Sequence, residues 1–253
     1  MEFSGLEKFS LVDFESKISA TLFFGGCNYK CPFCHNRLLV QNPHLLTKIP
    51  FEDILSFLKE RKGFIDAVVV SGGEPTLMND LKDKIIQIKK LGYLIKLDSN
   101  GSKPHILKDL IDNKLIDYVA MDIKNSFGKY NLTTDSKVDI SKIKESISII
   151  INSGIDHEFR TTVVKEFHTL EDIKEIGNAL VGAKRMRIQK FVPSENCIRK
   201  DLTEIDIETA KEFVSELKKT ISDTSLRGYW WLNLIKANQY NYKRRMQRSL
   251  RRW

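Results

Sequence analysis

Hydrophobic residues along this 253-residue chain fall into two alternating patterns. Short continuous runs, such as the Ala-Val-Val-Val of residues 67–70, are typical of parallel strands that are buried on both faces. Between such runs, apolar residues recur every three or four positions, as at Ile54, Leu55 and Leu58, and this spacing predicts amphipathic helices. The repeated alternation of the two patterns predicts an α/β fold in which right-handed crossovers join parallel strands.

The alternation repeats six times. Strands are expected within residues 17–24, 67–70, 93–97, 118–124, 158–164 and 185–192. Helices are expected within residues 51–58, 81–91, 104–113, 140–150 and 210–217, with a further one beginning after Thr169. Residues 1–17 are expected to pack across the edge of the sheet, and residues 125–138 are expected to form a polar loop.

The polar residues with the clearest chemical meaning follow the first predicted strand. Cys27, Cys31 and Cys34 lie at a C-x3-C-x2-C spacing. Three thiolates this close together repel one another unless a metal ion or a cluster takes up their charge. Zinc prefers four ligands, so a zinc site would need His35 or His44 as the fourth. An iron–sulfur cube has four irons, of which three cysteines hold three and leave one open for another ligand.

Two other strand ends carry residues suited to ligand binding. The run at residues 67–70 is followed by Ser-Gly-Gly-Glu-Pro, where two glycines let the backbone approach a ligand and Glu74 adds a carboxylate. The strand at residues 93–97 is followed by Asp-Ser-Asn-Gly, which are also ordinary turn residues. Barrel enzymes place their chemistry in the loops after such strand ends, so both motifs are candidates for one site.

Composition narrows the class of protein. Hydrophobic residues make up 42% and charged residues 29% of the chain, as in a soluble globular protein. No apolar run approaches the roughly 18 residues of a membrane-spanning helix. Only four cysteines occur and three of them are clustered, so no disulfide framework is expected and a cytoplasmic protein is predicted. The fourth, Cys197, is expected to be a bystander.

The net charge of +8 comes from the C-terminal segment. Residues 229–253 contain seven Lys or Arg and no Asp or Glu, so residues 1–228 are nearly neutral and are not expected to bind nucleic acid. The segment also contains Trp230, Trp231 and Trp253, and aromatic residues among basic ones are suited to RNA or to acidic surfaces. We expect it to be an appended tail without a catalytic role.

The loop from Cys27 to Asn36, Cys-Asn-Tyr-Lys-Cys-Pro-Phe-Cys-His-Asn, resembles the cluster loop of the radical S-adenosylmethionine (SAM) superfamily. Its Phe-Cys-His-Asn end resembles the glycyl-radical-enzyme activating proteins. Among these, the chain is most like the activating proteins of anaerobic ribonucleotide reductase, because residues 12–17, Val-Asp-Phe-Glu-Ser-Lys, resemble a Val-Asp-Tyr-Pro-Gly-Lys string in that group. The resemblance covers residues 1–228 and implies a partial (β/α)6 TIM-like barrel, the radical SAM core.

This resemblance implies cofactors and a reaction. Cys27, Cys31 and Cys34 are the implied ligands of a [4Fe–4S] cluster whose open iron binds SAM. An electron from a flavodoxin- or ferredoxin-type donor reaches SAM through the cluster and breaks the sulfonium carbon–sulfur bond, which gives methionine and a 5′-deoxyadenosyl radical. That radical takes a hydrogen atom from a backbone glycine of the partner, implied to be an anaerobic ribonucleotide reductase.

The resemblance also implies which residues contact SAM. The Gly72-Gly73-Glu74 motif matches one that hydrogen-bonds the ammonium group of SAM. The other implied residues of the SAM site are Phe33, His35, Asn36, Asp98, Ser99, Asn100, Lys124, Arg160 and Gln189.

A monovalent cation is implied by a narrower similarity. In pyruvate formate-lyase activating enzyme, residues that match Asp98, Ser99 and Asp122 hold such a cation, and hard cations prefer oxygen ligands. The residues alone leave simpler alternatives open. Lys124 can form a salt bridge with Asp122, and a buried Arg160 can pair with a carboxylate of the protein core.

Three other functions stay open at this point. The first is activation of a different glycyl radical enzyme, of the pyruvate formate-lyase type. The second is a radical SAM enzyme that acts on a small molecule or on tRNA, with the basic tail binding RNA. The third is a zinc or electron-transfer module without enzymatic activity.

Overall fold

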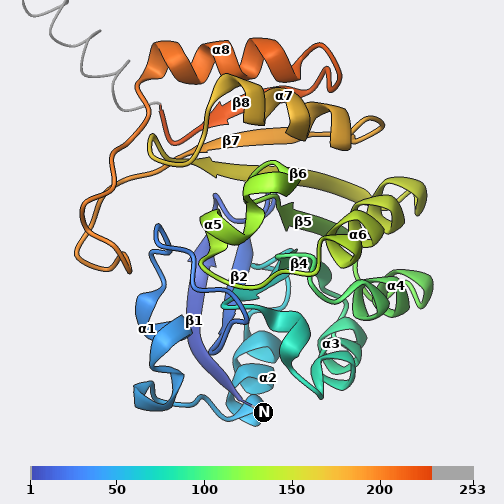
Figure 1. Ribbon diagram of the computed structural model, residues 1–253. Helices are drawn as coiled ribbons and strands as arrows, with labels where there is room; N and C mark the ends of the chain where they lie inside the picture. The colour runs from blue at the N-terminus through green and yellow to red at the C-terminus, as the bar shows by residue number, and fades with distance from the viewer. Residues whose placement is uncertain (1, 230–253) are drawn as a thin grey trace, which may run out of the picture.

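The computed structural model describes residues 2–229, and the predicted tail of residues 229–253 lies outside them except for Tyr229. Eight strands form one sheet whose spatial order is the chain order (Figure 1). The first pair is antiparallel, and every later strand runs parallel to the one before it. The strands are β1 (Phe3–Ser10), β2 (Ser19–Phe24), β3 (Ala67–Gly72), β4 (Leu94–Ser99), β5 (Tyr118–Asp122), β6 (Asp156–Val163), β7 (Met186–Lys190) and β8 (Thr224–Arg227).

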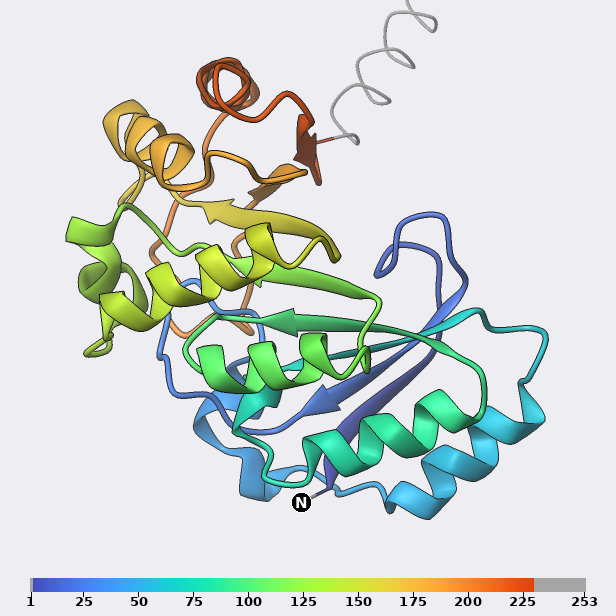
Figure 2. The same cartoon turned by 90° about the vertical axis from the view of Figure 1, so that its right-hand side faces the viewer.

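Helices occupy the connections between the parallel strands. Figure 1 shows them as an arc around the curved sheet, and Figure 2, the view turned by 90°, shows helices lying against its outer face. The longer helices are α2 (Phe51–Glu60), α3 (Leu81–Lys90), α4 (Pro104–Asp112), α6 (Ile140–Asn152), α7 (Leu170–Ala179) and α8 (Ile207–Leu217). The short ones are α1 (Arg37–Gln41), α5 (Tyr130–Thr134), η1 (Pro43–Leu45), η2 (Pro75–Leu77) and η3 (Phe127–Lys129).

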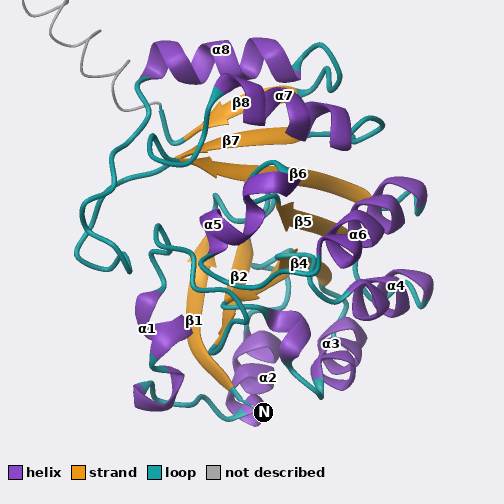
Figure 3. Ribbon diagram, viewed as in Figure 1, coloured by secondary structure: helices purple, strands orange, loops and turns teal. Residues whose placement is uncertain are grey.

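The burial pattern explains why these segments form these elements. Residues 67–70 of β3 are completely buried, as expected of a strand covered on both faces. Ile54 and Leu58 of α2 are also fully buried, and Leu55 packs against the same core. Helix α7 begins as predicted, with a capping box in which Thr169 and Asp172 each accept the other's backbone N–H. Figure 3 shows the helices, in purple, arranged along the outer side of the orange strands.

The sheet curls into a barrel that is open on one side. Among residues 2–229, β1 and β8 are the two edges of the sheet and pair with no further strand. This confirms the predicted α/β class and the partial TIM-like barrel. Two strands exceed the six that were predicted. In β1 only Phe3 and Ser10 are buried and irregularities interrupt its pairing, so it lacks a clear alternation, and β8 is only four residues long.

The parallel strands place their C-terminal ends at one edge of the barrel. The cysteine loop leaves β2 there, and the glycine pair and the Asp98 turn leave β3 and β4 beside it. The order of the strands therefore brings together candidate ligand-binding residues that are far apart in the sequence. Within the described part of the chain, we find no helix that is both long and apolar enough to cross a membrane.

Candidate cofactor-binding site

A cavity of about 200 Å³ opens at the C-terminal ends of β2 to β6. Its walls come from the loop after β2 and from the ends of four further strands. The lining residues are Cys27, Tyr29, Cys31, Phe33, Cys34, His35, Asn36, Val40, Ser71, Gly72, Gly73, Asp98, Ser99, Asn100, Asp122, Lys124, Arg160 and Thr162. The three clustered cysteines and most of the implied SAM-site residues therefore share one cavity.

The three thiols lie in a setting that disfavours a free negative charge. Burial raises the pKa of Cys27 to about 11 and that of Cys31 to about 12, and burial also raises the pKa of Cys34. Thiols of this kind lose their protons when a metal supplies the compensating charge. The backbone N–H of Tyr29 already points at the Cys27 sulfur over 3.4 Å. No three His, Cys, Asp or Glu side chains in residues 2–229 converge on a single point as ligands of one metal ion.

The glycine pair after β3 is required by a close approach to the cysteine loop. A Cβ atom on Gly73 would lie 1.9 Å from the carbonyl oxygen of Gly26, and one on Gly72 would lie 2.4 Å from the backbone nitrogen of Phe24. Gly72 also has a φ of +117°, which disfavours any side chain. The glycines thus let backbone carbonyl and amide groups form the cavity wall directly beside the cysteine loop.

The Glu74 carboxylate was expected beside the ligand, but the structure places it in the protein interior. It is fully buried and does not line the cavity. Its Oε1 accepts hydrogen bonds from Thr76 and from the Ser99 hydroxyl, and its Oε2 accepts the Asn100 backbone N–H at 2.6 Å. Burial raises the pKa of Glu74, and these donors oppose that shift. The side chain therefore joins the end of β3 to the end of β4.

Asn100 extends this connection to the cysteine loop. Its side-chain amide donates to the Asn28 oxygen at 2.9 Å and lies 3.9 Å from the Cys27 sulfur. Asn36, at the other end of that loop, donates to the Gly72 carbonyl at 3.4 Å. The cysteine loop is thus held at both ends by residues of the predicted site.

Charged residues form another part of the cavity wall. Lys124 lies 3.1 Å from one Asp122 oxygen, and Arg160 lies 2.8 Å from the other, so both simpler alternatives raised by the sequence are present in the structure. Burial alone would raise the pKa of Asp122, but Arg160 and Lys124 lower it to about 2. The same attraction raises the pKa of Lys124 against the effect of burial. At neutral pH this wall is fully ionised.

Two polar atoms of the cavity lining have no hydrogen-bond partner among residues 2–229. One is the hydroxyl of Tyr29, whose side chain is almost completely buried, and the other is Oδ1 of Asp98. Leaving buried polar atoms unpaired is costly, so a cavity with such atoms is suited to a polar ligand. The lining therefore fits a ligand such as SAM, and the three thiols are a donor set that suits iron–sulfur irons.

The residues that line the cavity differ at a few positions from those expected from the sequence. Gln189 was expected at the cofactor, but it lies on β7 with its amide oxygen 3.4 Å from the Thr162 hydroxyl and is not part of the lining. Ser71 and Thr162 were not predicted, although both follow a strand pattern that could have indicated them. Tyr29 lies in the irregular cysteine loop and Val40 in the five-residue helix α1, and neither segment is long and regular enough for a periodic signal to identify its inward-facing side chains.

The loop after β7 reaches across to the cysteine loop. The backbone N–H of Arg199 donates to the Pro32 carbonyl at 2.8 Å, and a ring nitrogen of His35 lies 2.7 Å from the Val192 carbonyl. In Figure 1 this orange loop descends toward α1. It carries Cys197, which is completely buried and outside the cavity lining.

Comparisons with known proteins place the chain in a family. The model of the radical SAM superfamily matches residues 21–180. A protein of Methanocaldococcus jannaschii that carries the provisional name glycyl-radical enzyme activating enzyme is 38% identical over 201 residues, which cover 76% of this chain and 80% of that protein. A second protein of that organism with the same provisional name is 26% identical and covers 87% of this chain and 85% of its own length.

Solved structures with the same fold are more distant in sequence. Streptococcus suis SuiB bound to S-adenosylmethionine has a TM-score of 0.64 at 16% identity, over 82% of this chain and 52% of that one. A domain of pyruvate-formate lyase-activating enzyme from Bacteroides vulgatus has a TM-score of 0.54 at 14% identity, over 64% of this chain and 99% of that one. Together with the family match, these findings show that the chain is an enzyme of the radical SAM superfamily.

Proposed function

We propose that this enzyme uses a [4Fe–4S] cluster and SAM to generate a glycyl radical on an anaerobic ribonucleotide reductase. One observation carries the proposal: Cys27, Cys31 and Cys34 share one cavity with the β3 glycine pair, in a chain 38% identical to a protein provisionally named a glycyl-radical enzyme activating enzyme. The string at residues 12–17 supports ribonucleotide reductase as the target.

The chain itself contributes binding, orientation and exclusion of water. When bound, the cluster and SAM supply a 5′-deoxyadenosyl radical through one-electron cleavage of the sulfonium carbon–sulfur bond. The three thiols would hold three irons, and the backbone at Gly72 and Gly73 would accept hydrogen bonds from the SAM ammonium group. Buried Tyr29 and Phe33 line the same space and keep water away from a reactive radical.

The open side of the barrel suits a macromolecular substrate. A backbone glycine is part of a folded partner, so the partner must present it on a loop that enters the cavity from outside. Because β1 and β8 leave a gap in the part of the barrel that the structure describes, such a loop has a route that a closed barrel would lack. We further propose that residues 1–228 are the catalytic core, that the protein works in the cytoplasm, and that a flavodoxin- or ferredoxin-type protein donates the electron.

Electron paramagnetic resonance tests the proposed target. Anaerobically reconstituted protein, SAM and a reductant are incubated with the anaerobic reductase encoded in the same genome, and a glycyl doublet is expected. The doublet should collapse to a singlet when the reductase is produced with α-deuterated glycine. Omission of SAM and a reductase with its radical glycine changed to alanine are the controls.

Two other outcomes of this experiment would indicate a different substrate for the enzyme. A doublet on a pyruvate formate-lyase-type enzyme but not on the reductase would show a different glycyl radical partner. SAM cleavage without a radical on any glycyl radical enzyme would favour a small-molecule or tRNA substrate. Strongly salt-dependent RNA binding would then identify the tRNA case.

A further inference from the structure

Two carboxylates of the cavity end neighbouring strands. Asp98 lies near the end of β4 and Asp122 is the last residue of β5, and these strands pair side by side. Both carboxylates line the cavity, and their side chains are only 16% and 29% exposed. Two partly buried negative charges this close need positive charge nearby. The resemblance implies that a monovalent cation bound at Asp98, Ser99 and Asp122 supplies this positive charge.

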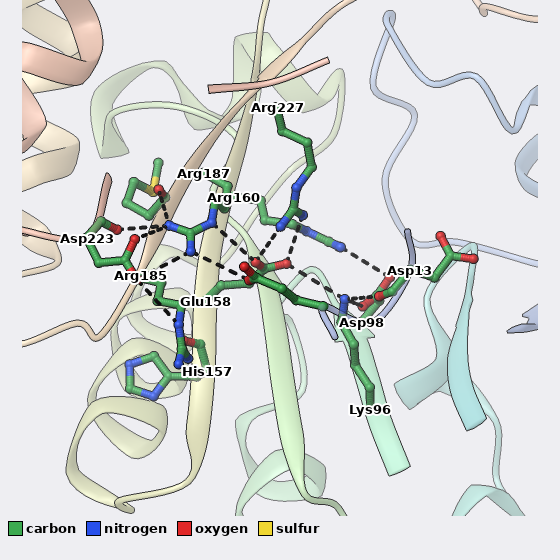
Figure 4. A network of polar contacts seen from close by, with 12 residues as sticks. Asp13, Lys96, Asp98, His157, Glu158, Arg160, Arg185, Arg187, Asp223 and Arg227 are labelled. Carbon is green, nitrogen blue, oxygen red and sulfur yellow. Dashed lines mark hydrogen bonds and ion pairs between the residues drawn. The ribbon is translucent and has the colours of Figure 1, made fainter. Parts of the chain in front are cut away.

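Arg160 already supplies that positive charge. The register of β5 and β6 pairs it directly with Asp122, so its side chain leaves the sheet beside that carboxylate. Its Nε lies 2.8 Å from Asp122 Oδ1, and a terminal nitrogen lies 3.2 Å from Asp98 Oδ2. Figure 4 shows the guanidinium directed at Asp98. One rigid, planar cation thus bridges the two carboxylates.

Four of the five side-chain oxygens expected to bind a metal cation already take part in hydrogen bonds. Asp98 Oδ2 also accepts a hydrogen bond from the Ser71 hydroxyl, and Asp122 Oδ2 accepts one from the Lys124 ammonium group. The Ser99 hydroxyl donates to Glu74 and accepts the Gly101 backbone N–H. The remaining oxygen, Asp98 Oδ1, faces the ammonium group of Lys96 at 3.6 Å. A metal cation here would lie among three fixed positive charges.

A buried charge network holds Arg160 and Lys96 in place. Lys96 lies 3.7 Å from Glu158, and Arg227 contacts both oxygens of Glu158 at 3.0 and 2.8 Å (Figure 4). Glu158 also contributes to the raised pKa of Arg160, against the effect of burial. Because these partners lie on β4, β6 and β8, Arg160 cannot leave the carboxylates without disturbing charges across the barrel.

We propose that the Arg160 guanidinium takes the place of the monovalent cation, so that this enzyme binds SAM without K⁺ or Na⁺. The residues Asp98, Ser99 and Asp122 do not fit a bound metal cation as they are arranged here. The inference rests on the proposed use of SAM, and it is independent of which protein receives the radical. In consequence, side chains of the protein balance the charges of the SAM site, and no bound metal cation is needed.

The dissociation constant of SAM in different salts tests this directly. It is measured with the cluster-loaded protein in potassium, sodium and tetramethylammonium chloride at equal ionic strength, because tetramethylammonium is too large for a metal site. For the native protein we expect values that agree within about twofold, a difference of well under 1 kcal/mol. A dissociation constant that rises about tenfold or more when tetramethylammonium replaces K⁺ would overturn the proposal.

An Arg160→Gln variant should acquire the cation dependence that the native protein lacks. Removing the guanidinium leaves Asp98 and Asp122 without their shared partner, so K⁺ should tighten SAM binding about tenfold relative to tetramethylammonium. Arg160→Lys, which keeps one point charge, should show a smaller effect. If K⁺ has the same effect on Arg160→Gln as on the native protein, the guanidinium does not occupy a cation site.

The midpoint temperature of thermal unfolding tests the proposal without SAM and without a measurement of activity. The midpoint of the native protein should be the same in K⁺ and tetramethylammonium salts, and that of Arg160→Gln should be higher in K⁺. An equal K⁺ shift in both proteins would contradict the proposal. A protein that binds no SAM in any salt would instead refute the proposed function, so the two failures are distinguishable. If Arg160→Gln does not fold, the native measurements alone still decide.

Discussion

Asn100 donates its backbone N–H to the Glu74 carboxylate across 2.6 Å, and this bond joins the ends of two neighbouring strands inside the protein. Thr76 and Ser99 donate to the other carboxylate oxygen, so Glu74 is surrounded by donors of the protein itself. The carboxylate holds the glycine turn against the Asn100 turn. The cavity wall that faces the ligand is then the glycine backbone and not the acid.

A Glu74→Gln substitution should therefore destabilise the protein even without SAM. An amide nitrogen would face donors that now point at a carboxylate oxygen, at a cost of about 1–3 kcal/mol. Urea unfolding of the SAM-free protein measures the effect, with the exposed Glu212→Gln as the matched control. Weaker SAM binding with unchanged SAM-free stability would mean that the acid contacts SAM directly.

Tyr29→Phe should stabilise the empty protein and weaken SAM binding. The buried Tyr29 hydroxyl has no hydrogen-bond partner in the part of the chain that the structure describes, so its removal relieves an unpaired polar group and should raise the unfolding free energy by about 1 kcal/mol. Tyr93→Phe is the control, because the Tyr93 hydroxyl donates to the Leu58 carbonyl at 2.6 Å and its loss should destabilise. Calorimetry with SAM then shows whether the ligand uses the Tyr29 hydroxyl. Equal losses of stability in both variants would contradict this account.

The charge network should make stability fall in acid. Burial would raise the pKa of Glu158, but the Arg227 hydrogen bonds and nearby positive charges lower it from 4.5 to about 2. A depressed pKa stabilises the folded state above the unfolded value, and this stabilisation is lost as the pH falls from about 5 to about 2. The size is about 3 kcal/mol for this almost fully buried group.

The comparison of Glu158→Gln with the native protein isolates that contribution. The variant should be less stable at neutral pH, and the difference in urea unfolding should shrink toward pH 2. Asp112→Asn removes an exposed ion pair with Lys108 and should show no such trend. A difference between Glu158→Gln and the native protein that does not change with pH would point to packing and not to charge.

A chain that ends after Tyr229 should keep SAM cleavage and partner activation. Tyr229 is buried, and its hydroxyl donates to the Ile205 carbonyl at 3.3 Å, so the end of the chain should be cut after this residue and not before it. Loss of partner activation with intact SAM cleavage would give the residues beyond Tyr229 a role in docking. Loss of both would contradict the proposed domain division.

Much of this architecture follows from local patterns. A buried strand is identified by the continuous apolar run at residues 67–70, because a strand covered on both faces is apolar at every position. The helix before it is identified by the spacing of Ile54 and Leu58, because a helix buried on one face has apolar residues every three or four positions. The edge strand Phe3–Ser10 was missed because a half-exposed edge strand has no strict alternation. The cysteine loop could be recognised from the sequence because the C-x3-C-x2-C spacing is a local feature that needs no knowledge of the fold.

The charged interior could not be predicted in the same way. Lys96 lies in the middle of β4 and Glu158 in β6, where charged residues contradict a pattern-based prediction of buried strands. Their burial depends on partners that the fold brings from other strands. For the same reason, whether Arg160 faces SAM or a core carboxylate could not be decided before its register with Asp122 was known.

Reductive cleavage of SAM by anaerobically reconstituted protein tests the central claim most directly. The measured quantity is 5′-deoxyadenosine formed under dithionite, together with iron and acid-labile sulfide content. We predict product from the native protein and from Cys197→Ala, whose thiol is buried outside the cavity lining, and none from Cys31→Ala. Full SAM cleavage by Cys31→Ala, or a native protein that binds zinc and no sulfide, would contradict the account.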